Sequence, residues 1–180
     1  MPTKLLTLTA FLAMPETKPT SEYIDGQLLQ KPMPQGKRSA LQSDLIGLIN
    51  AAARAQKVVR AFPELRCTFG GSAIVPDMAV FVWARIQREQ NGEIVNVFPL
   101  APDWAIEILS SGQGTTKVTK KLLHWVKHRS QMGWLIALED RAALVYRPPQ
   151  AVEICDQPDA LLPMPDFMDE LSLTTAALFD

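Results

Sequence analysis

Two short apolar segments each contain a single acidic residue, and this pattern constrains the fold more than any other feature of the chain. Asp77 lies within Ile74–Trp83, and Glu107 is flanked by isoleucines within Trp104–Leu109. Both segments have the length and apolar character of buried strands. A carboxylate buried in such a strand is costly unless it is paired with a base or bound to a metal, so each acid needs a partner.

Turn, cap and apolar residues divide the rest of the chain into alternating helices and strands. The expected helices cover residues 5–14, 39–56, 116–129 and 174–178. The expected strands cover residues 23–29 (a hairpin that turns at Asp25-Gly26), 58–69, 74–83, 104–109, 134–138 and 143–146. This order predicts an α/β fold, with a mixed sheet flanked by helices.

The 180 residues, of which 47% are hydrophobic, have the size and composition of one globular domain. We expect a single domain over 1–180, with an N-terminal helix and hairpin extension over about 1–35 and an acidic C-terminal segment over about 151–180. No run of about 18 apolar residues occurs, so no membrane-spanning segment is predicted. The apolar run after Lys4 is interrupted by threonines and lacks a small-residue cleavage site, so we expect a cytoplasmic protein.

Charge is distributed unevenly along the chain. Residues 151–180 contain seven acids and no base, whereas residues 1–150 hold 18 basic and 12 acidic side chains, a net charge of +6. A basic body beside an acidic tail suits a polyanionic partner such as nucleic acid. A solvated helix face beside an acidic surface gives the same totals, and charge alone favours this second interpretation.

The helix expected over 116–129 offers a base to the two acids. When its residues are placed 100° apart, Lys120 lies opposite the apolar stripe and Lys121 lies at its border. A border lysine can bury its stem and hold its ammonium beside the sheet, and two close carboxylates also suit a hard divalent cation such as Mg²⁺. Three alternatives stay open: Asp77 as a turn residue, Glu107 paired on the sheet surface, and Lys121 as an ordinary border lysine.

The histidines and cysteines give weaker signals. His124 and His128 are four residues apart, but the glutamate of the HExxH zinc pattern is absent, so a zinc site there is a minor alternative. Cys67 and Cys155 match no metal-ligand spacing and are expected to be buried free thiols.

The ordered set of motifs resembles the PD-(D/E)XK nuclease superfamily, and more closely its restriction-endonuclease family of Uma type. The resemblance covers nearly the whole chain and rests on Glu22-Tyr23-Ile24-Asp25-Gly26, Lys31–Lys37, Pro76-Asp77, Glu107-Ile108-Leu109-Ser110 and Lys121-Leu122-Leu123-His124-Trp125. It implies a restriction-endonuclease-like core and hydrolysis of DNA that depends on Mg²⁺, with Mn²⁺ as a second suitable ion. Because cutting both strands of a duplex usually needs two active sites, it also favours a homodimer.

The resemblance further implies roles for individual residues. Asp77, Glu107 and the carbonyl group of Ile108 would hold the metal, Lys121 would orient the attacking water, and Glu22 is a candidate additional acid, with a surface position before the hairpin as its alternative. The superfamily's usual lysine, two residues after the glutamate, is replaced by Leu109, and in the resembling family the following helix supplies it, which is where Lys121 stands. Phosphate contacts are expected from four basic residues: Lys37, Arg38, Lys117 and Lys120.

One departure from the family pattern favours a different class of function. Arg38 stands where this family usually has a histidine, which would suit a catalytically inactive nucleic-acid-binding or assembly module that retains the nuclease fold. The retention of Asp77, Glu107 and Lys121 favours the enzyme. The nuclease interpretation requires the two carboxylates to lie within about 6 Å of each other, close enough to share an ion. It also requires Lys121 to point into the same cavity while Lys120 faces solvent.

Overall fold

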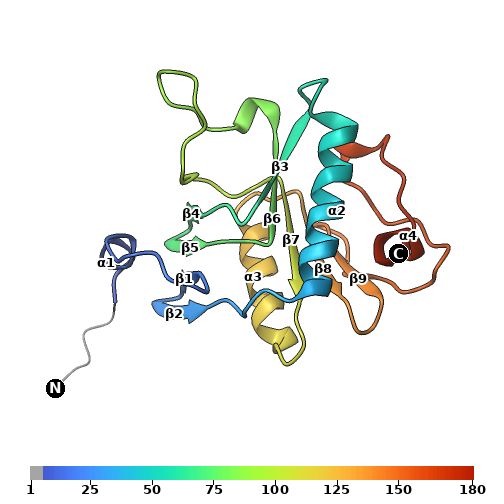
Figure 1. Ribbon diagram of the computed structural model, residues 1–180, viewed down its shortest axis with the longest axis horizontal. Helices are drawn as coiled ribbons and strands as arrows, with labels where there is room; N and C mark the ends of the chain where they lie inside the picture. Colours follow the sequence, from blue (N-terminus) through green and yellow to red (C-terminus); the bar gives the residue numbers. More distant parts are fainter. Residues whose placement is uncertain (1–5) are drawn as a thin grey trace.

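The computed structural model describes residues 6–180, so the first residue of the expected N-terminal helix, Leu5, and the preceding Lys4 lie outside the described residues. The larger of its two sheets has the strand order β10-β9-β8-β7-β6-β3 (Figure 1). Its strands are β3 (Val59–Pro63), β6 (Met78–Val82), β7 (Trp104–Leu109), β8 (Met132–Ala137), β9 (Ala142–Tyr146) and β10 (Glu153–Cys155). β7 and β8 run parallel and are connected through the helix α3 (Thr115–Lys127), as a parallel pair requires.

A smaller sheet has the order β2-β1-β5-β4 and is antiparallel. Its strands are β1 (Ser21–Ile24), β2 (Gln27–Gln30), β4 (Cys67–Phe69) and β5 (Ser72–Ile74). β1 and β2 form the expected hairpin. Its turn residues Asp25 and Gly26 both have positive φ, 51° and 76°, which is the backbone that a two-residue turn of this kind requires.

Helices cover both faces of the large sheet. α2 (Gly36–Ala53) packs on one face through Leu41, Leu45 and Ile49, which contact the cluster around Trp104 and Trp134. α3 packs on the opposite face through its apolar stripe, and the small sheet joins it there. In Figure 1, α2 lies in front of the large sheet and α3 behind it. The mixed α/β fold with flanking helices is therefore confirmed.

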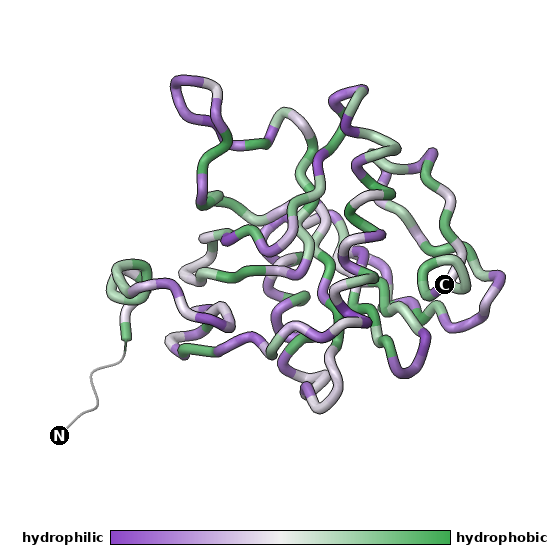
Figure 2. The backbone as a smooth tube through the Cα atoms, viewed as in Figure 1, coloured by the Kyte–Doolittle hydropathy of each residue, from purple (hydrophilic) through white to green (hydrophobic). Residues whose placement is uncertain are grey.

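The acidic C-terminal segment covers the α2 side of the core. Met168, Leu173 and Leu178 are buried against α2, whereas all seven acids of the segment are exposed. The segment contains a 3-10 helix (Asp166–Met168) and ends in α4 (Thr175–Phe179). Figure 2 shows a similar division between interior and surface across the molecule, with many hydrophobic residues along the central strands and hydrophilic residues at the outer loops.

Two segments that the sequence predicts as single strands are each divided between the two sheets. Residues 58–69 form β3 in the large sheet and β4 in the small one, and residues 74–83 extend from the end of β5 through β6. The first division follows Pro63, and the second occurs at Pro76, because a proline has no N–H to donate to a ladder.

The expected helices differ from the observed ones mainly at their ends. α1 (Leu8–Leu12) is shorter than the run from which it was predicted, and α2 begins at Gly36, three residues before the expected start, with Gln35 as N-cap. Within residues 6–180, no helix combines the length and the hydropathy needed to cross a membrane.

Candidate active site

The candidate site lies where the chain passes from the small sheet to the large one, between β5 and β6. The backbone of Val75 lies outside both sheets there, and two side chains bond it. Its N–H donates to Glu22 Oε1 over 2.9 Å, and its carbonyl accepts from Lys31 Nζ over 2.8 Å. Glu22 lies on β1 and Lys31 directly follows β2, so the N-terminal hairpin holds in place the link that carries Asp77.

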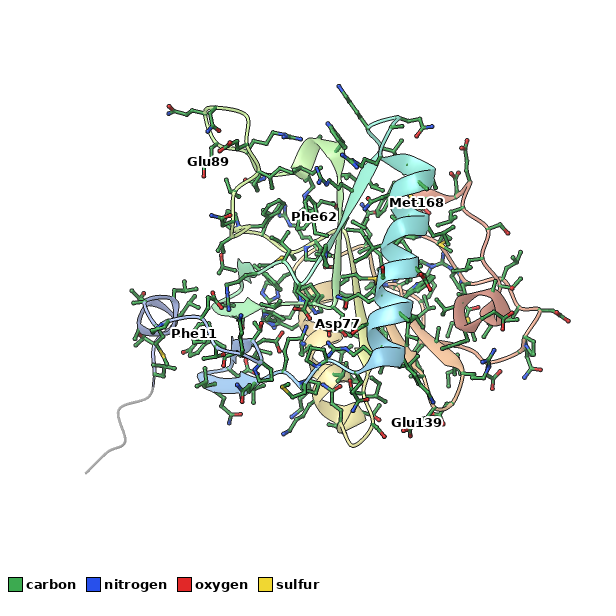
Figure 3. The ribbon with its side chains drawn as sticks, in the orientation of Figure 1. Phe11, Phe62, Asp77, Glu89, Glu139 and Met168 are labelled. Atoms are coloured by element: carbon green, nitrogen blue, oxygen red, sulfur yellow. The ribbon has the colours of Figure 1, made fainter. Side chains whose placement is uncertain are left out.

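Asp77 is buried in the middle of the molecule, beside α2 (Figure 3). Its Oδ1 accepts from Lys31 Nζ over 2.7 Å and from the guanidinium group of Arg38, and its Oδ2 accepts from the Ile108 N–H over 2.7 Å. Burial by itself would raise the pKa of this carboxyl group, but Lys31, Arg38 and Lys121 outweigh it and lower the pKa to about 2. Asp77 is therefore a fixed negative charge.

Strand register brings Glu107 to the same place. Met78 pairs with Ile106 in the antiparallel β6–β7 ladder, and continuing this register by one residue sets Asp77 opposite Glu107. Because side chains alternate along a strand, Ile106 and Ile108 face α2 while Glu107 faces α3. Glu107 is 3% exposed, which excludes the alternative of an ion pair on the sheet surface.

Lys121 connects Glu107 to Glu22. Its Nζ lies 2.8 Å from Glu107 Oε1 and 3.0 Å from Glu22 Oε1, and the lysine is 6% exposed. Burial lowers the pKa of such an ammonium group, but here the neighbouring carboxylates outweigh burial and raise it above its usual value. The neighbouring Lys120 is exposed, as the helical wheel predicts.

Of these three buried acids, Glu107 has the fewest polar contacts. Burial raises its pKa to about 7, and the nearby negative charges of Asp77 and Glu22 add to this effect while Lys121 opposes it. The ion pair with Lys121 is the one polar contact of Glu107 Oε1 among the described residues. This oxygen can accept a further ligand.

The charged side chains face a cavity of about 390 Å³. Six of the charged residues that line it are buried, three acids and three bases: Glu22, Asp77, Glu107, Lys31, Arg38 and Lys121. Their formal charges cancel, and each of the six residues is at least nine-tenths buried. The loop 111–114 and the first turns of α3, with Lys117, form another part of the wall.

The donor atoms of the cavity fit a hard divalent cation. Asp77 Oδ2 accepts one hydrogen bond and Glu107 Oε1 contacts Lys121 alone, and carboxylate oxygens are the ligands that Mg²⁺ and Mn²⁺ prefer. The Ile108 carbonyl adds a third oxygen, since it points to the same side of β7 as the N–H that Asp77 accepts. Residues 6–180 contain no cluster of three or more His, Cys, Asp or Glu side chains suited to a metal, so waters or substrate would complete the shell.

The cavity brings together most of the residues that the sequence singles out. Asp77, Glu107, Lys121 and Glu22 line it with Ile108, Arg38 and Lys117, whereas Lys37 and Lys120 do not. The surface alternative for Glu22 does not hold, because its side chain is buried.

Sequence reasoning missed the role of Lys31. A lysine between a hairpin and Pro32 looks like a solvated residue, and its sole signal was its place in a stretch that carries the family resemblance.

The two histidines of α3 lie elsewhere. Their ring centroids are 4.3 Å apart, and both pack against Phe69 of β4. His128 Nδ1 bonds to the carbonyl of His124 over 2.8 Å, so these rings are part of the packing between α3 and the small sheet.

Comparison with known proteins identifies the family. The family described as "Uma2: Putative restriction endonuclease" matches residues 8–176. The chain is also similar to a solved structure described as a "putative nuclease belonging to DUF820 from Anabaena variabilis ATCC 29413". The two share 57% sequence identity with a TM-score of 0.94, over 96% of this chain and 97% of the other. No curated protein matches the chain. The chain therefore belongs to the Uma2 family of restriction-endonuclease-like proteins.

Proposed function

We propose that the protein is a metal-dependent endonuclease that hydrolyses phosphodiester bonds of DNA in the cavity around Asp77. The observation that carries this proposal is the buried ammonium group of Lys121, held between Glu22 and Glu107 beside a second carboxylate. Membership of a nuclease family supports the same class of reaction.

The side chains of the cavity have separate tasks in this proposal. Lys121 carries a fixed positive charge, which would orient a water molecule and offset the negative charge that develops on the phosphate. Glu22 bonds both Lys121 and the Val75 backbone, so it positions the lysine. Asp77, Glu107 and the Ile108 carbonyl would hold Mg²⁺ or Mn²⁺, which supplies a Lewis acid and lowers the pKa of a bound water.

Basic residues at the mouth of the cavity would contact the rest of the DNA. Lys117 lines the wall, and Lys37 and Lys120 lie exposed on the first turns of α2 and α3. Charged contacts of this kind fix the position of a duplex without reading its sequence. A homodimer would bring two cavities to one duplex, and light scattering of the protein with and without DNA tests this part of the proposal.

The test compares wild type with Glu107→Gln on a supercoiled plasmid. Wild type should nick or cut the plasmid with Mg²⁺ or Mn²⁺ and not with EDTA, and the variant should lose at least about 100-fold in rate. Glu89→Gln is the matched control, because Glu89 is exposed at the tip of the loop between β6 and β7, far from Asp77 in Figure 3. Equal rates for wild type and Glu107→Gln would refute the assignment.

One observation favours a second candidate, a nucleic-acid-binding or assembly module without catalysis. Asp77 Oδ1 already has two basic partners, and the six buried charges balance without a metal. This candidate predicts that the protein binds DNA equally with Mg²⁺ and with EDTA, and that neither wild type nor Glu107→Gln cuts the plasmid.

A further inference from the structure

We propose that Lys31 and Arg38 are built-in counter-ions of Asp77, and that they make the cavity bind a divalent cation and a phosphate group as a pair. This inference deepens the proposed function and rests on it. It concerns two residues whose contacts with Asp77 place them inside the metal site rather than at the DNA-binding surface.

The first support is the position of the two bases. Both contact the same oxygen of Asp77, Oδ1, and Lys31 and Arg38 are 7% and 4% exposed. A cation that binds Asp77 must share this carboxylate with two positive charges already in place. Because the three groups are buried, their repulsion is screened far less than it would be at the surface.

The second support is the charge balance of the cavity. With three buried acids against three buried bases, a divalent cation alone would leave two uncompensated positive charges in a buried space, which is costly. A phosphodiester group brings one negative charge, so its arrival offsets part of this cost. This effect is reciprocal: if a bound phosphate raises the affinity of the cavity for the cation, a bound cation raises its affinity for the phosphate by the same factor.

The third support is a donor with no partner. Arg38 Nε is buried and has no hydrogen-bond partner among the described residues, although the same guanidinium group contacts Asp77 through another nitrogen. A planar guanidinium group with a spare N–H suits the two oxygens of a phosphate. A metal bound to Asp77 would replace Arg38 and Lys31 as partners of this carboxylate, and both bases could then donate hydrogen bonds to the phosphate.

The test measures Mn²⁺ binding by calorimetry, with and without a short DNA duplex. A phosphorothioate duplex keeps the backbone charge, and a methylphosphonate duplex of the same sequence removes it. Wild type should bind Mn²⁺ at least about tenfold more tightly with the charged duplex, and the neutral duplex should give no gain. Equal Mn²⁺ affinity in all three conditions would overturn the inference without any variant.

Two substitutions assign the effect to the counter-ions. Arg38→Gln should bind Mn²⁺ alone at least about tenfold more tightly than wild type, and its gain from the charged duplex should shrink. Arg38→Lys keeps the charge but loses the planar guanidinium group, so it should bind Mn²⁺ alone as weakly as wild type and show a smaller gain from the charged duplex. Unchanged affinity in Arg38→Gln would overturn the role of this residue.

The inference and the proposed function fail in different ways. If wild type cleaves DNA with Mn²⁺ but its Mn²⁺ affinity is the same with and without the charged duplex, the proposed nuclease function holds and the counter-ion role is refuted. Absence of both cleavage and Mn²⁺ binding, in wild type and in Arg38→Gln, would remove both. If Arg38→Gln fails to fold, as circular dichroism would reveal, the three wild-type titrations still decide.

Discussion

Replacing Glu107 by glutamine should remove a cost of folding that depends on pH. Burial raises the pKa of Glu107 from 4.5 to about 7 in the folded protein, despite the opposing charge of Lys121. The folded state therefore holds this proton more tightly than the unfolded state does. The contribution of Glu107 to the free energy of unfolding is largest below pH 4.5, falls as the pH rises to about 7, and stays level above that.

The size of this effect follows from the pKa shift. A rise from 4.5 to about 7 corresponds to about 3 kcal/mol between the acidic and the alkaline plateau. Glutamine has nearly the same shape as the protonated acid and does not titrate. The variant should therefore match wild type near pH 4 and exceed its free energy of unfolding by about 3 kcal/mol near pH 8, or by about 6–12 °C in melting temperature for a chain of this length.

Urea denaturation of both proteins, at several values between about pH 4 and pH 8.5, measures the difference. The other acids titrate in both proteins, so the difference isolates Glu107. A difference that stays constant with pH would refute the buried, proton-binding state of this carboxyl group. A wild type that is more stable than the variant near pH 8 would show that the ion pair with Lys121 outweighs burial.

Three further predictions concern other parts of the molecule. Lys121→Met should lower the free energy of unfolding by about 3–5 kcal/mol near pH 8, because it leaves buried carboxylates without their ammonium partner. The loss should be smaller near pH 4, where Glu107 is protonated; urea denaturation at both pH values tests this. Gly70→Ala should lower the free energy of unfolding by about 1–3 kcal/mol, because φ is +53° at Gly70 and an added Cβ would lie 2.3 Å from His128 Nε2. Gly47→Ala should raise the free energy of unfolding by about 0.5–1 kcal/mol, because Gly47 lies on α2 with open space around the added Cβ. Thermal melting compares these two variants, and equal melting temperatures would contradict the close approach at Gly70. The double change Asp169→Asn and Glu170→Gln should shift DNA affinity by less than a few-fold in a filter-binding assay, because both acids are exposed and no residue after Lys121 lines the cavity. A large gain in affinity would identify the acidic C-terminal segment as an autoinhibitory mimic of DNA.

The sequence predicts those parts of the fold that depend on local pattern. Trp104–Leu109 forms β7 with the expected bounds, because six consecutive residues without a turn signal leave few alternatives. The border position of Lys121 on its helix is also correct, since 100° spacing fixes which side chains lie beside the apolar stripe.

The division of the strands between two sheets could not be predicted in the same way. Pro76 marks a break within residues 74–83, but the pattern around it gives no sign that the two parts join different sheets or that Val75 leaves both. What makes the break tolerable is a pair of side chains, Glu22 and Lys31, which lie more than 40 positions earlier and bond the Val75 backbone. A periodicity of two or 3.6 residues carries no information about such distant partners.

The charge balance of the site was hidden for the same reason. The three acids are visible as anomalies or by resemblance, but Lys31 and Arg38 lie among polar residues and prolines where bases are ordinary. Their burial depends on the hairpin and on the start of α2 meeting at Asp77, which is a tertiary event.

Because Glu22 and Lys31 of the hairpin region hold the Val75 backbone, the cavity cannot form from one local segment of the chain. The residues that hold Asp77, Glu107 and Lys121 in place reach back to Glu22, so the cavity is assembled from segments spread over most of the first 121 residues. A nascent chain to which Lys121 has not yet been added has no such cavity. The proposed site for a metal and a phosphate therefore requires these long-range contacts, and a partly folded chain that lacks them does not form it.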